Sequence, residues 1–368
     1  MDNENKYQVI DPDSDKYKLT AKDIIDDKKA QKKKKRKKRI LIALLCIFLI
    51  FSLLFGTGAL IINGYLNKIN FGDTSGEVDP NLDSEESLSF EEQADADADI
   101  RANLDDSVLW YDDDVYNILL AGYDYGDRKD GEYSNYLSRS DAMILISINK
   151  KDGVVNMVSL SRAAYVAIPG HGNKRLNAAH AYGGASLLVE TVEKNYKIRI
   201  DKYVTVNFDG FQSIIDALGG VSVSMSSTEA RVILGKSSGG TYTLDGEDAM
   251  AFARLRSIDT DRDRTGRQRK ILNAIASKLR QASVSQLIDL LDVFLPLVTT
   301  NFTKTELLGQ MVNVPKYLKY SVQESIIPHD YVPLTLRDGK EVLILDWEKT
   351  NAYTHKLLYP GMVPDSAK

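Results

Sequence analysis

The sequence has almost no cysteine, because Cys46 is the only one among its 368 residues. A single cysteine excludes an intrachain disulfide and any cysteine-based metal site in the rest of the chain. The four histidines, His171, His180, His329 and His355, lack the spacing of metal ligands, so we expect surface or hydrogen-bonding roles for them. A domain without such cross-links depends on its hydrophobic core, and this chain is long enough to form one.

Common catalytic motifs are also absent. The chain has no GxxxxGK[ST] phosphate-binding loop, no GxGxxG after a predicted strand, no GxSxG elbow and no HExxH helix. Any chemistry must therefore come from another combination of residues.

Long apolar segments are rare, and one of them stands out. Residues 40–62 form a run of 23 residues without a charge. A helix rising ~1.5 Å per residue over this length spans a hydrocarbon core of ~30 Å. A cleaved signal peptide is not favoured, because the preceding charged region is long and no small-x-small cleavage site follows. A buried soluble helix would rarely be apolar on every side. We predict a transmembrane anchor helix at 40–62.

Charge is divided unevenly along the chain, although the formal net charge is only −5. Residues 28–39 contain ten Lys or Arg and no acid, so we predict that 1–39 is a basic cytoplasmic tail beside anionic lipid. This tail has no interleaved aromatic residues and abuts the apolar run, so we expect no nucleic-acid partner. Residues 71–114 contain sixteen Asp or Glu against Arg101 alone, which predicts an acidic extracytoplasmic stalk over 63–114.

From Val115 onward, apolar strands alternate with amphipathic helices. Strands are expected at 115–124, 141–150, 153–162, 201–210, 221–226 and 341–347, with a hairpin turn at 151–153. Helices are expected at 185–196, 211–220, 245–256, 265–280, 285–297 and 303–312. Asp245 is a predicted N-cap, and Gly219 with Gly220 is a predicted left-handed C-cap. The mixture predicts an α/β domain at 115–368, layered, with a central mixed β-sheet flanked by helices.

Arginines gather at the expected ends of these strands and helices. Guanidinium groups bind phosphate oxygens in pairs, and the first turn of a helix presents backbone N–H groups to anions. Arg264 and Gln268 are one helical turn apart and therefore share a side. The set comprises Arg139, Arg162, Arg254, Arg256, Arg264, Arg267 and Gln268. It favours a di- or triphosphate site, although such residues at helix ends also form surface ion pairs.

Two aspartates flank the same strands. Asp124 follows the first expected strand, and Asp141 begins the second. Two carboxylates can hold Mg²⁺ on a phosphate substrate, so we predict Mg²⁺ as the cofactor.

Several stretches of the chain, in this order, resemble a known family. They are NILLAGYD, RSDAMILISIN, VVNMVSLSR, KRLNAAHAYGG, VNFDGFQSIIDALGGVSV, LDGEDAMAFARLR and DRDRTGRQRKIL. In these motifs the chain resembles the LytR-CpsA-Psr family of cell-envelope proteins, most strongly over 115–280. The predicted anchor also fits that family.

The resemblance implies a phosphotransferase in the cell membrane, single-pass, with its N-terminus in the cytoplasm and its main domain outside. Its partners would be an undecaprenyl-diphosphate-linked glycopolymer (teichoic acid or capsule-like polysaccharide), the acceptor peptidoglycan, and membrane lipid. By position, Asp124 and Asp141 would hold Mg²⁺, and Asp141 and Arg162 would be catalytic. The diphosphate would be bound by Arg139, Arg162, Arg254, Arg256, Arg264, Arg267 and Gln268. The prenyl chain would need an apolar slot near 187–192 and 271–279.

One position departs from the family pattern. The family usually has Pro-Arg-Asp where this chain has Ser161-Arg162-Ala163. The missing carboxylate could have oriented a neighbouring arginine. Two alternatives stay open: a pyrophosphatase acting on the same lipid diphosphates, and a non-catalytic protein that binds lipid diphosphate and regulates the envelope, which Ala163 makes plausible. A transcription attenuator is disfavoured, because the predicted topology separates the domain from DNA.

Overall fold

The computed structural model describes residues 69–73, 76–79, 82, 90–105, 108–124, 136–256, 258, 261–281, 293, 295–303, 305–306, 310, 313, 316–317, 320–336 and 339–362. The predicted tail at 1–39, the predicted anchor at 40–62 and Cys46 lie outside these residues. Among the described residues, no helix combines the length and the apolar content that crossing a membrane requires.

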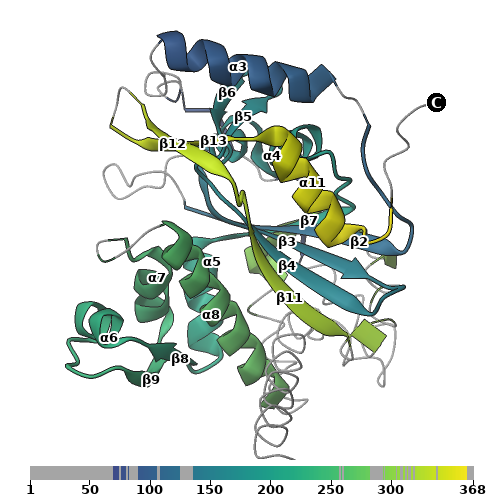
Figure 1. Cartoon of the computed structure of the whole chain (residues 1–368). Coiled ribbons are helices and arrows are strands. Elements are labelled where there is room, and N and C mark those ends of the chain that lie inside the picture. The colour runs from purple at the N-terminus through teal and green to yellow at the C-terminus, as the bar shows by residue number, and fades with distance from the viewer. Residues whose placement is uncertain are drawn as a thin grey trace, which may run out of the picture.

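Within the described residues, a seven-stranded sheet forms the centre of the domain (Figure 1). Strand β2 is parallel to β7 and antiparallel to β3, and β4 is parallel to β11, so the sheet is mixed as predicted. Its order is β1 (Asn70–Phe71), β10 (Val298–Thr300), β7 (Lys202–Asn207), β2 (Val115–Tyr123), β3 (Ser140–Asn149), β4 (Val154–Leu160) and β11 (Ser321–Ile327).

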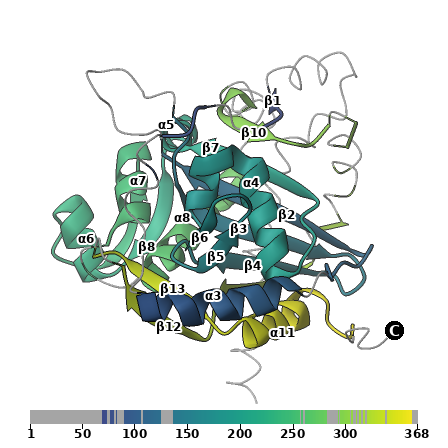
Figure 2. The same cartoon turned by 90° about the horizontal axis from the view of Figure 1, so that it is seen from above.

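Helices cover both faces of this sheet, which explains why β2 and β3 are apolar on both sides (Figure 1). The first layer contains α3 (Phe90–Asp105), α4 (Ala178–Tyr196) and α11 (Trp347–Leu358), and Figure 2 shows α3 beside α11. The second layer contains α5 (Phe208–Ala217), α7 (Gly246–Arg254) and α8 (Asp261–Gln281), and beside it lies α6 (Ser227–Leu234).

Short hairpins extend both layers. The first layer includes β5 (Tyr165–Ile168) with β6 (Gly172–Arg175), and β12 (Tyr331–Thr335) with β13 (Glu341–Leu345). The second includes β8 (Val221–Met225) with β9 (Gly240–Leu244). Of these strands, only β8 and β13 were predicted. The predicted helices at 285–297 and 303–312 lie mostly outside the described residues, and Leu295–Leu297 forms a 3₁₀ turn.

Predicted helix ends agree with the structure. The Asp245 side chain caps α7 by accepting a hydrogen bond from the backbone N of Asp248 at 2.9 Å. After α5, Gly219 and Gly220 both have positive φ, at 68° and 81°. A Cβ at Gly220 would lie 2.8 Å from the carbonyl O of Leu244, so a side chain there would clash with β9.

The predicted stalk at 63–114 needs correction. Residues 90–105 form α3, and Ala96 and Ile100 on one of its faces are buried. The side chain of Asn103 donates to the carbonyl O of Asn195 in α4 at 2.9 Å. The acidic repeat concealed this helix, because its few apolar residues are spaced one turn apart while Asp95 and Asp99 stay exposed.

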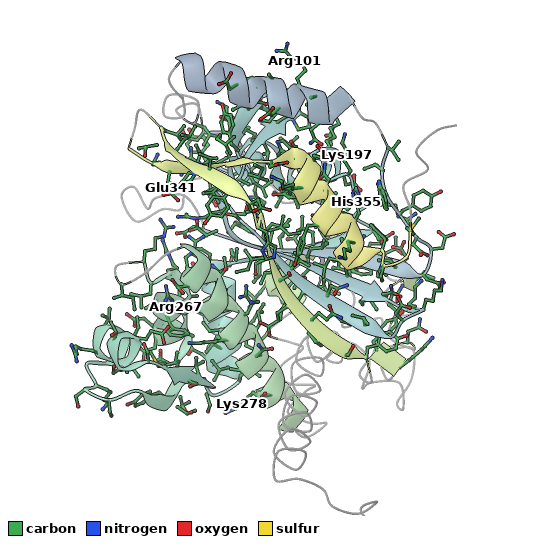
Figure 3. The ribbon with its side chains drawn as sticks, in the orientation of Figure 1. Arg101, Lys197, Arg267, Lys278, Glu341 and His355 are labelled. Carbon is green, nitrogen blue, oxygen red and sulfur yellow. The ribbon has the colours of Figure 1, made fainter. Side chains whose placement is uncertain are left out.

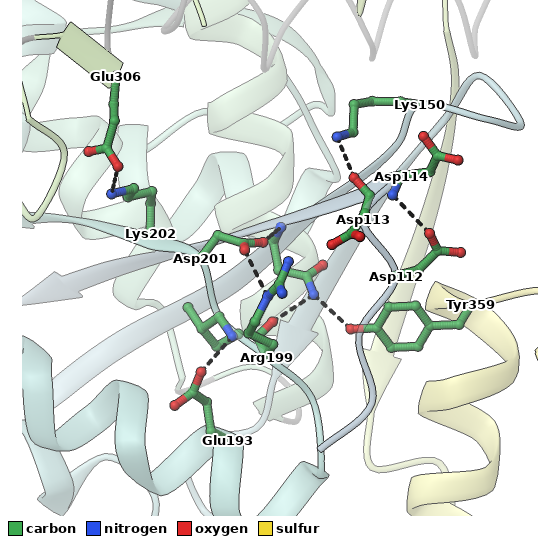
Figure 4. Close-up of polar contacts among 12 residues, drawn as sticks. Asp112, Asp113, Asp114, Lys150, Glu193, Arg199, Asp201, Lys202, Glu306 and Tyr359 are labelled. Carbon is green, nitrogen blue, oxygen red and sulfur yellow. Dashed lines mark hydrogen bonds and ion pairs between the residues drawn. The ribbon is translucent and has the colours of Figure 1, made fainter. Parts of the chain in front are cut away.

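A rear network of polar residues, Asn117, Arg199, Asp201 and Tyr359, lies where β2 and β7 begin (Figure 4). Asp201 accepts the backbone N–H of Asn117 at 2.8 Å and pairs with Nε of Arg199 at 3.0 Å. The Asn117 side chain donates to the carbonyl O of Arg199 at 2.7 Å and to Oη of Tyr359 at 2.9 Å. The network thereby ties the end of α11 to the sheet.

Candidate functional site

Predicted site residues come together at the edge of the sheet opposite to the rear network, which we call the site edge. Strands β2, β4 and β7 end at this edge and β3 begins there, as their pairing requires. Asp124 follows β2, Asp141 is the second residue of β3, and Arg162 comes two residues after β4. Three segments that are distant in sequence therefore deliver charged side chains to one place.

A β-bulge sets the position of Asp141. Gly122 pairs with Ala142 but Tyr123 pairs with Ser140, so Asp141 is the extra residue between the two pairs. Such bulges bend a strand and redirect the side chain of the extra residue. On its other side β3 pairs with β4, and Ile144 lies opposite Ser159. Arg162 follows β4, and its Nη1 lies 2.6 Å from Oδ1 of Asp141.

The end of α7 contributes two more guanidinium groups. Nη1 of Arg254 lies 3.4 Å from Oδ2 of Asp124, and Nη2 of Arg256 lies 3.6 Å from Oδ1 of Asp141. The Arg254 guanidinium also stacks over the ring of Phe208, 4.9 Å from its centroid. One short segment therefore contacts both aspartates.

Helix α8 supplies Arg264 and Gln268 from successive turns. Arg264 is only 2% exposed. Nε2 of Gln268 donates to the backbone O of Asp141 at 3.4 Å. Their spacing predicted that they share a side of the helix, and both side chains line the same cavity.

The pKa of Asp141 is lowered by its surroundings. Burial of the carboxyl group acts in the opposite direction and is the largest single influence, but the guanidinium groups of Arg162, Arg264 and Arg256 together outweigh it. Asp141 is therefore a stable carboxylate at neutral pH.

A cavity of about 190 Å³ opens beside these charged groups, between the sheet and the second helical layer. Asp141, Arg254, Arg256, Arg264 and Gln268 form its polar part. Most of the remaining wall is apolar, and includes Leu120, Ile144, Val204, Val206, Phe211, Ile214, Met250, Ile271, Leu272 and Ile275. Along α8, the polar and apolar lining residues are separated: Arg264 and Gln268 come first, and Ile271 to Ile275 follow. At 1.5 Å per residue, Arg264 and Ile275 are about 16 Å apart along the helix axis.

Four of the predicted residues do not line the cavity. Arg162 and Asp124 contact the lining residues Asp141 and Arg254, and Arg139 directly precedes β3. Arg267 does not line the cavity either, and its guanidinium contacts Glu229 and the carbonyl O of Leu255. The segment Leu187–Val192 belongs to α4 and packs on the other face of the sheet, so of the two predicted parts of an apolar slot only the one on α8 borders the cavity.

Asp124 and Asp141 are the two carboxylates predicted to hold Mg²⁺, and each of them is paired with an arginine at this edge. Within the described residues, no three or more His, Cys, Asp or Glu side chains gather into a cation site. Asp124 and Asp141 are brought to the same edge, and the Arg254–Arg256 segment contacts both. Mg²⁺ commonly takes one or two carboxylates together with substrate phosphates, so a pair is a suitable donor set.

The sequence did not predict that β7 and α5 line the cavity. Val204 and Val206 alternate along β7, and Phe211 and Ile214 are three residues apart on α5. These patterns predicted a strand and a helix, but they are also typical of ordinary core residues.

Ala163 is the position at which the chain departs from the family pattern. Its backbone O accepts a hydrogen bond from the N–H of Leu343 at 2.8 Å, so this residue helps to join β13 to the domain.

A family model described as the LytR_cpsA_psr family matches residues 81–357. The chain is 36% identical over 231 residues to the polyisoprenyl-teichoic acid–peptidoglycan teichoic acid transferase TagT of Bacillus subtilis (strain 168), covering 60% of this chain and 70% of that protein. It is 36% identical over 215 residues to the transferase TagU of Oceanobacillus iheyensis, covering 56% of this chain and 64% of the relative, so that match spans less than two thirds of the relative's length.

Solved structures agree with this match. A structure described as TagT bound to LI-WTA is 30% identical, with a TM-score of 0.53, over 67% of this chain and 92% of that one. A second structure, of protein gbs0355 from Streptococcus agalactiae, is 26% identical, with a TM-score of 0.55, over 66% of this chain and 88% of that one.

Proposed function

This chain belongs to the LytR-CpsA-Psr family, and we propose that it is a phosphotransferase that attaches a glycopolymer from a polyprenyl diphosphate carrier to peptidoglycan. Its relatives TagT and TagU are named as teichoic acid transferases of this kind. We further propose a teichoic acid or capsule-like polysaccharide as the glycopolymer.

The observation that carries the proposal is the division of the cavity into a charged part and an apolar part. A polyprenyl diphosphate has a multiply charged headgroup and a long hydrocarbon tail. Arg254, Arg256 and Arg264 offer guanidinium groups to the headgroup, while Ile271, Leu272 and Ile275 offer an apolar surface to the tail.

The transfer breaks one phosphorus–oxygen bond and forms another. An acceptor sugar hydroxyl attacks the phosphorus that carries the glycopolymer, and the bond from this phosphorus to the bridging oxygen breaks. A prenyl monophosphate leaves and takes up the proton released by the hydroxyl, and the glycopolymer becomes joined to the acceptor through a phosphodiester. The arginines Arg162, Arg254, Arg256 and Arg264, with Gln268, hold the diphosphate and stabilise the charge that accumulates on the phosphoryl oxygens. For Arg139, direct contact with the diphosphate stays a prediction.

Asp141 has two conceivable roles, and its environment favours one of them. As a general base it would take the proton of the acceptor hydroxyl. Its lowered pKa makes it a weak base, which favours a role in holding charge and geometry. We propose that Asp141 and Asp124 hold Mg²⁺. Bound there, Mg²⁺ would help to neutralise the transferring phosphoryl group.

We also propose a location at the cell membrane. Residues 40–62 would anchor the chain, residues 1–39 would lie in the cytoplasm, and the domain would lie outside. The apolar run beside a block of ten basic residues supports this topology. Protease treatment of intact cells tests it, since digestion of the domain is expected from outside.

A purified transfer assay tests the activity. The intact protein is given Mg²⁺, a polyprenyl-diphosphate-linked oligosaccharide and peptidoglycan, and the products are analysed with and without the acceptor. We expect oligosaccharide joined to peptidoglycan together with prenyl monophosphate, and loss of both products in Arg162→Ala. Products formed equally without acceptor would indicate hydrolysis, and binding without turnover would indicate a non-catalytic protein. Full activity in Arg162→Ala would remove the site assignment.

A further inference from the structure

Arg267 is a buried arginine beside the cavity that does not line it. Its side chain is only 1% exposed and lies within the layer formed by α5, α7 and α8 (Figure 3). Nη1 is 3.5 Å from Oε1 of Glu229, and Nη2 donates to the carbonyl O of Leu255. A buried guanidinium is costly to desolvate, so specific partners such as these are needed to hold it in place.

Glu229, the acidic partner, is itself fixed. It is 6% exposed and forms the capping box of α6, in which its Oε2 accepts the backbone N–H of Ser226 at 2.8 Å. The same oxygen lies 3.4 Å from Nζ of Lys270 on α8. The contacts therefore run without interruption from the α6 cap through Glu229 and Arg267 to Leu255.

Leu255 is the residue between the two exposed arginines of the site. Its backbone is extended, with φ −56° and ψ 124°, and its side chain is buried. Leu255 is not among the residues that line the cavity, whereas Arg254 and Arg256 on either side of it are. The side chains of these two arginines are 50% and 53% exposed.

We propose that Arg267 is a positioning residue, which fixes the Leu255 carbonyl so that Arg254 and Arg256 reach the diphosphate together. This rests on the proposed function, because it assumes that those two arginines bind a lipid diphosphate. Two long, exposed side chains lose considerable rotamer freedom when they converge on one ligand. An anchored backbone between them lowers that cost and fixes the geometry.

Binding of geranylgeranyl diphosphate to the folded protein, measured by calorimetry, tests the proposal through a double-mutant cycle. The first variant, Arg267→Gln with Glu229→Gln, removes both buried charges together, so that neither is left without its partner. The second, Arg254→Ala with Arg256→Ala, removes the residues that are positioned. The third combines all four substitutions. Arg231→Gln on exposed α6 is the matched control, and thermal unfolding is recorded for every variant.

We expect the first variant to weaken binding roughly tenfold, and the combined variant to bind no more weakly than the second, because Arg267 acts only through Arg254 and Arg256. If the losses of affinity in the first and second variants multiplied in the combined variant, the proposal would be overturned. A lower melting temperature of the first variant with unchanged affinity would also overturn it. The Arg267→Lys variant gives a second measure, with partial recovery expected. If the wild type did not bind, or if Arg264→Ala left binding unchanged, the proposed function itself would fail. If the wild type bound, Arg264→Ala lost binding and the variant of Arg267 with Glu229 kept the wild-type affinity, only the role of Arg267 would be overturned.

Discussion

The two edges of the central sheet carry the same kinds of residues in different settings. At the site edge, Asp141 pairs with Arg162 at 2.6 Å, and at the rear edge Asp201 pairs with Arg199 at 3.0 Å. The rear aspartate also accepts a backbone N–H, and its network ties α11 to the sheet (Figure 4). The site aspartate instead borders an apolar cavity lined by three further arginines. An ion pair alone therefore does not indicate a ligand site, and the apolar cavity beside Asp141 is what distinguishes the site edge from the rear edge.

The largest effect should come from matched substitutions of the two aspartates. Asp141→Asn removes the carboxylate that organises the site arginines, and we expect transfer to fall by about 100-fold or more. Asp201→Asn should leave transfer unchanged and lower the free energy of unfolding by about 1–3 kcal/mol, because the backbone N–H of Asn117 loses a charged acceptor. Transfer assays and denaturant unfolding of both variants measure these changes. Equal losses of transfer at the two edges would erase the distinction.

A smaller effect is expected when the apolar part of the cavity is filled. Leu272→Trp places a large ring there, and we expect the affinity for geranylgeranyl diphosphate to fall about tenfold through lost volume for the chain. Binding of inorganic pyrophosphate, which has no chain, should not change. Val232→Trp on exposed α6 is the control. Equal weakening for both ligands would mean that the cavity does not hold the chain.

At the rear edge, the loss of one hydrogen bond should affect stability alone. Tyr359→Phe removes the hydroxyl that accepts from the Asn117 side chain, and we expect the free energy of unfolding to fall by about 1 kcal/mol. Transfer per folded molecule should stay at the wild-type level. A reduced transfer rate in this variant would show that the rear network has a functional role.

The smallest effect concerns pH. Because the pKa of Asp141 is lowered in the folded protein, the stability linked to its ionisation is present above the ordinary aspartate pKa of about 3.9. That contribution is lost as the pH falls through the folded pKa. The difference in unfolding free energy between the wild type and Asp141→Asn should thus be flat from pH 5 to 8 and decrease below about pH 4. A change between pH 6 and 8 would indicate a raised pKa instead.

The sequence predicted the strands and helices that carry the site, because β2, β3 and β4 are apolar enough to be recognised and α7 has a clear cap at Asp245. It did not predict α3, since its buried residues, such as Ala96 and Ile100, are sparse among acids. The spacing of Arg264 and Gln268 predicted that they share a side of the helix, and both line the cavity. The same reasoning could not separate Arg267 from them, because its direction depends on Glu229, a residue 38 positions away.

The sheet and α5 side of the apolar part was beyond sequence reasoning for a different reason. Val204, Phe211 and Ile214 have the periodicity of core residues, and only the arrangement of β7, α5 and α8 leaves space between them. The predicted slot near Leu187–Val192 illustrates the problem. That segment has the same pattern, but it fills the core on the opposite face.

The central claim is that guanidinium groups from separate segments converge on one cavity that holds a lipid diphosphate. A crystal structure of the protein with geranylgeranyl diphosphate tests it most directly. We predict that the diphosphate contacts Arg162, Arg254, Arg256 and Arg264, and that the prenyl chain runs between β7, α5 and α8. A ligand bound on the α4 face, or a diphosphate distant from these arginines, would contradict the account.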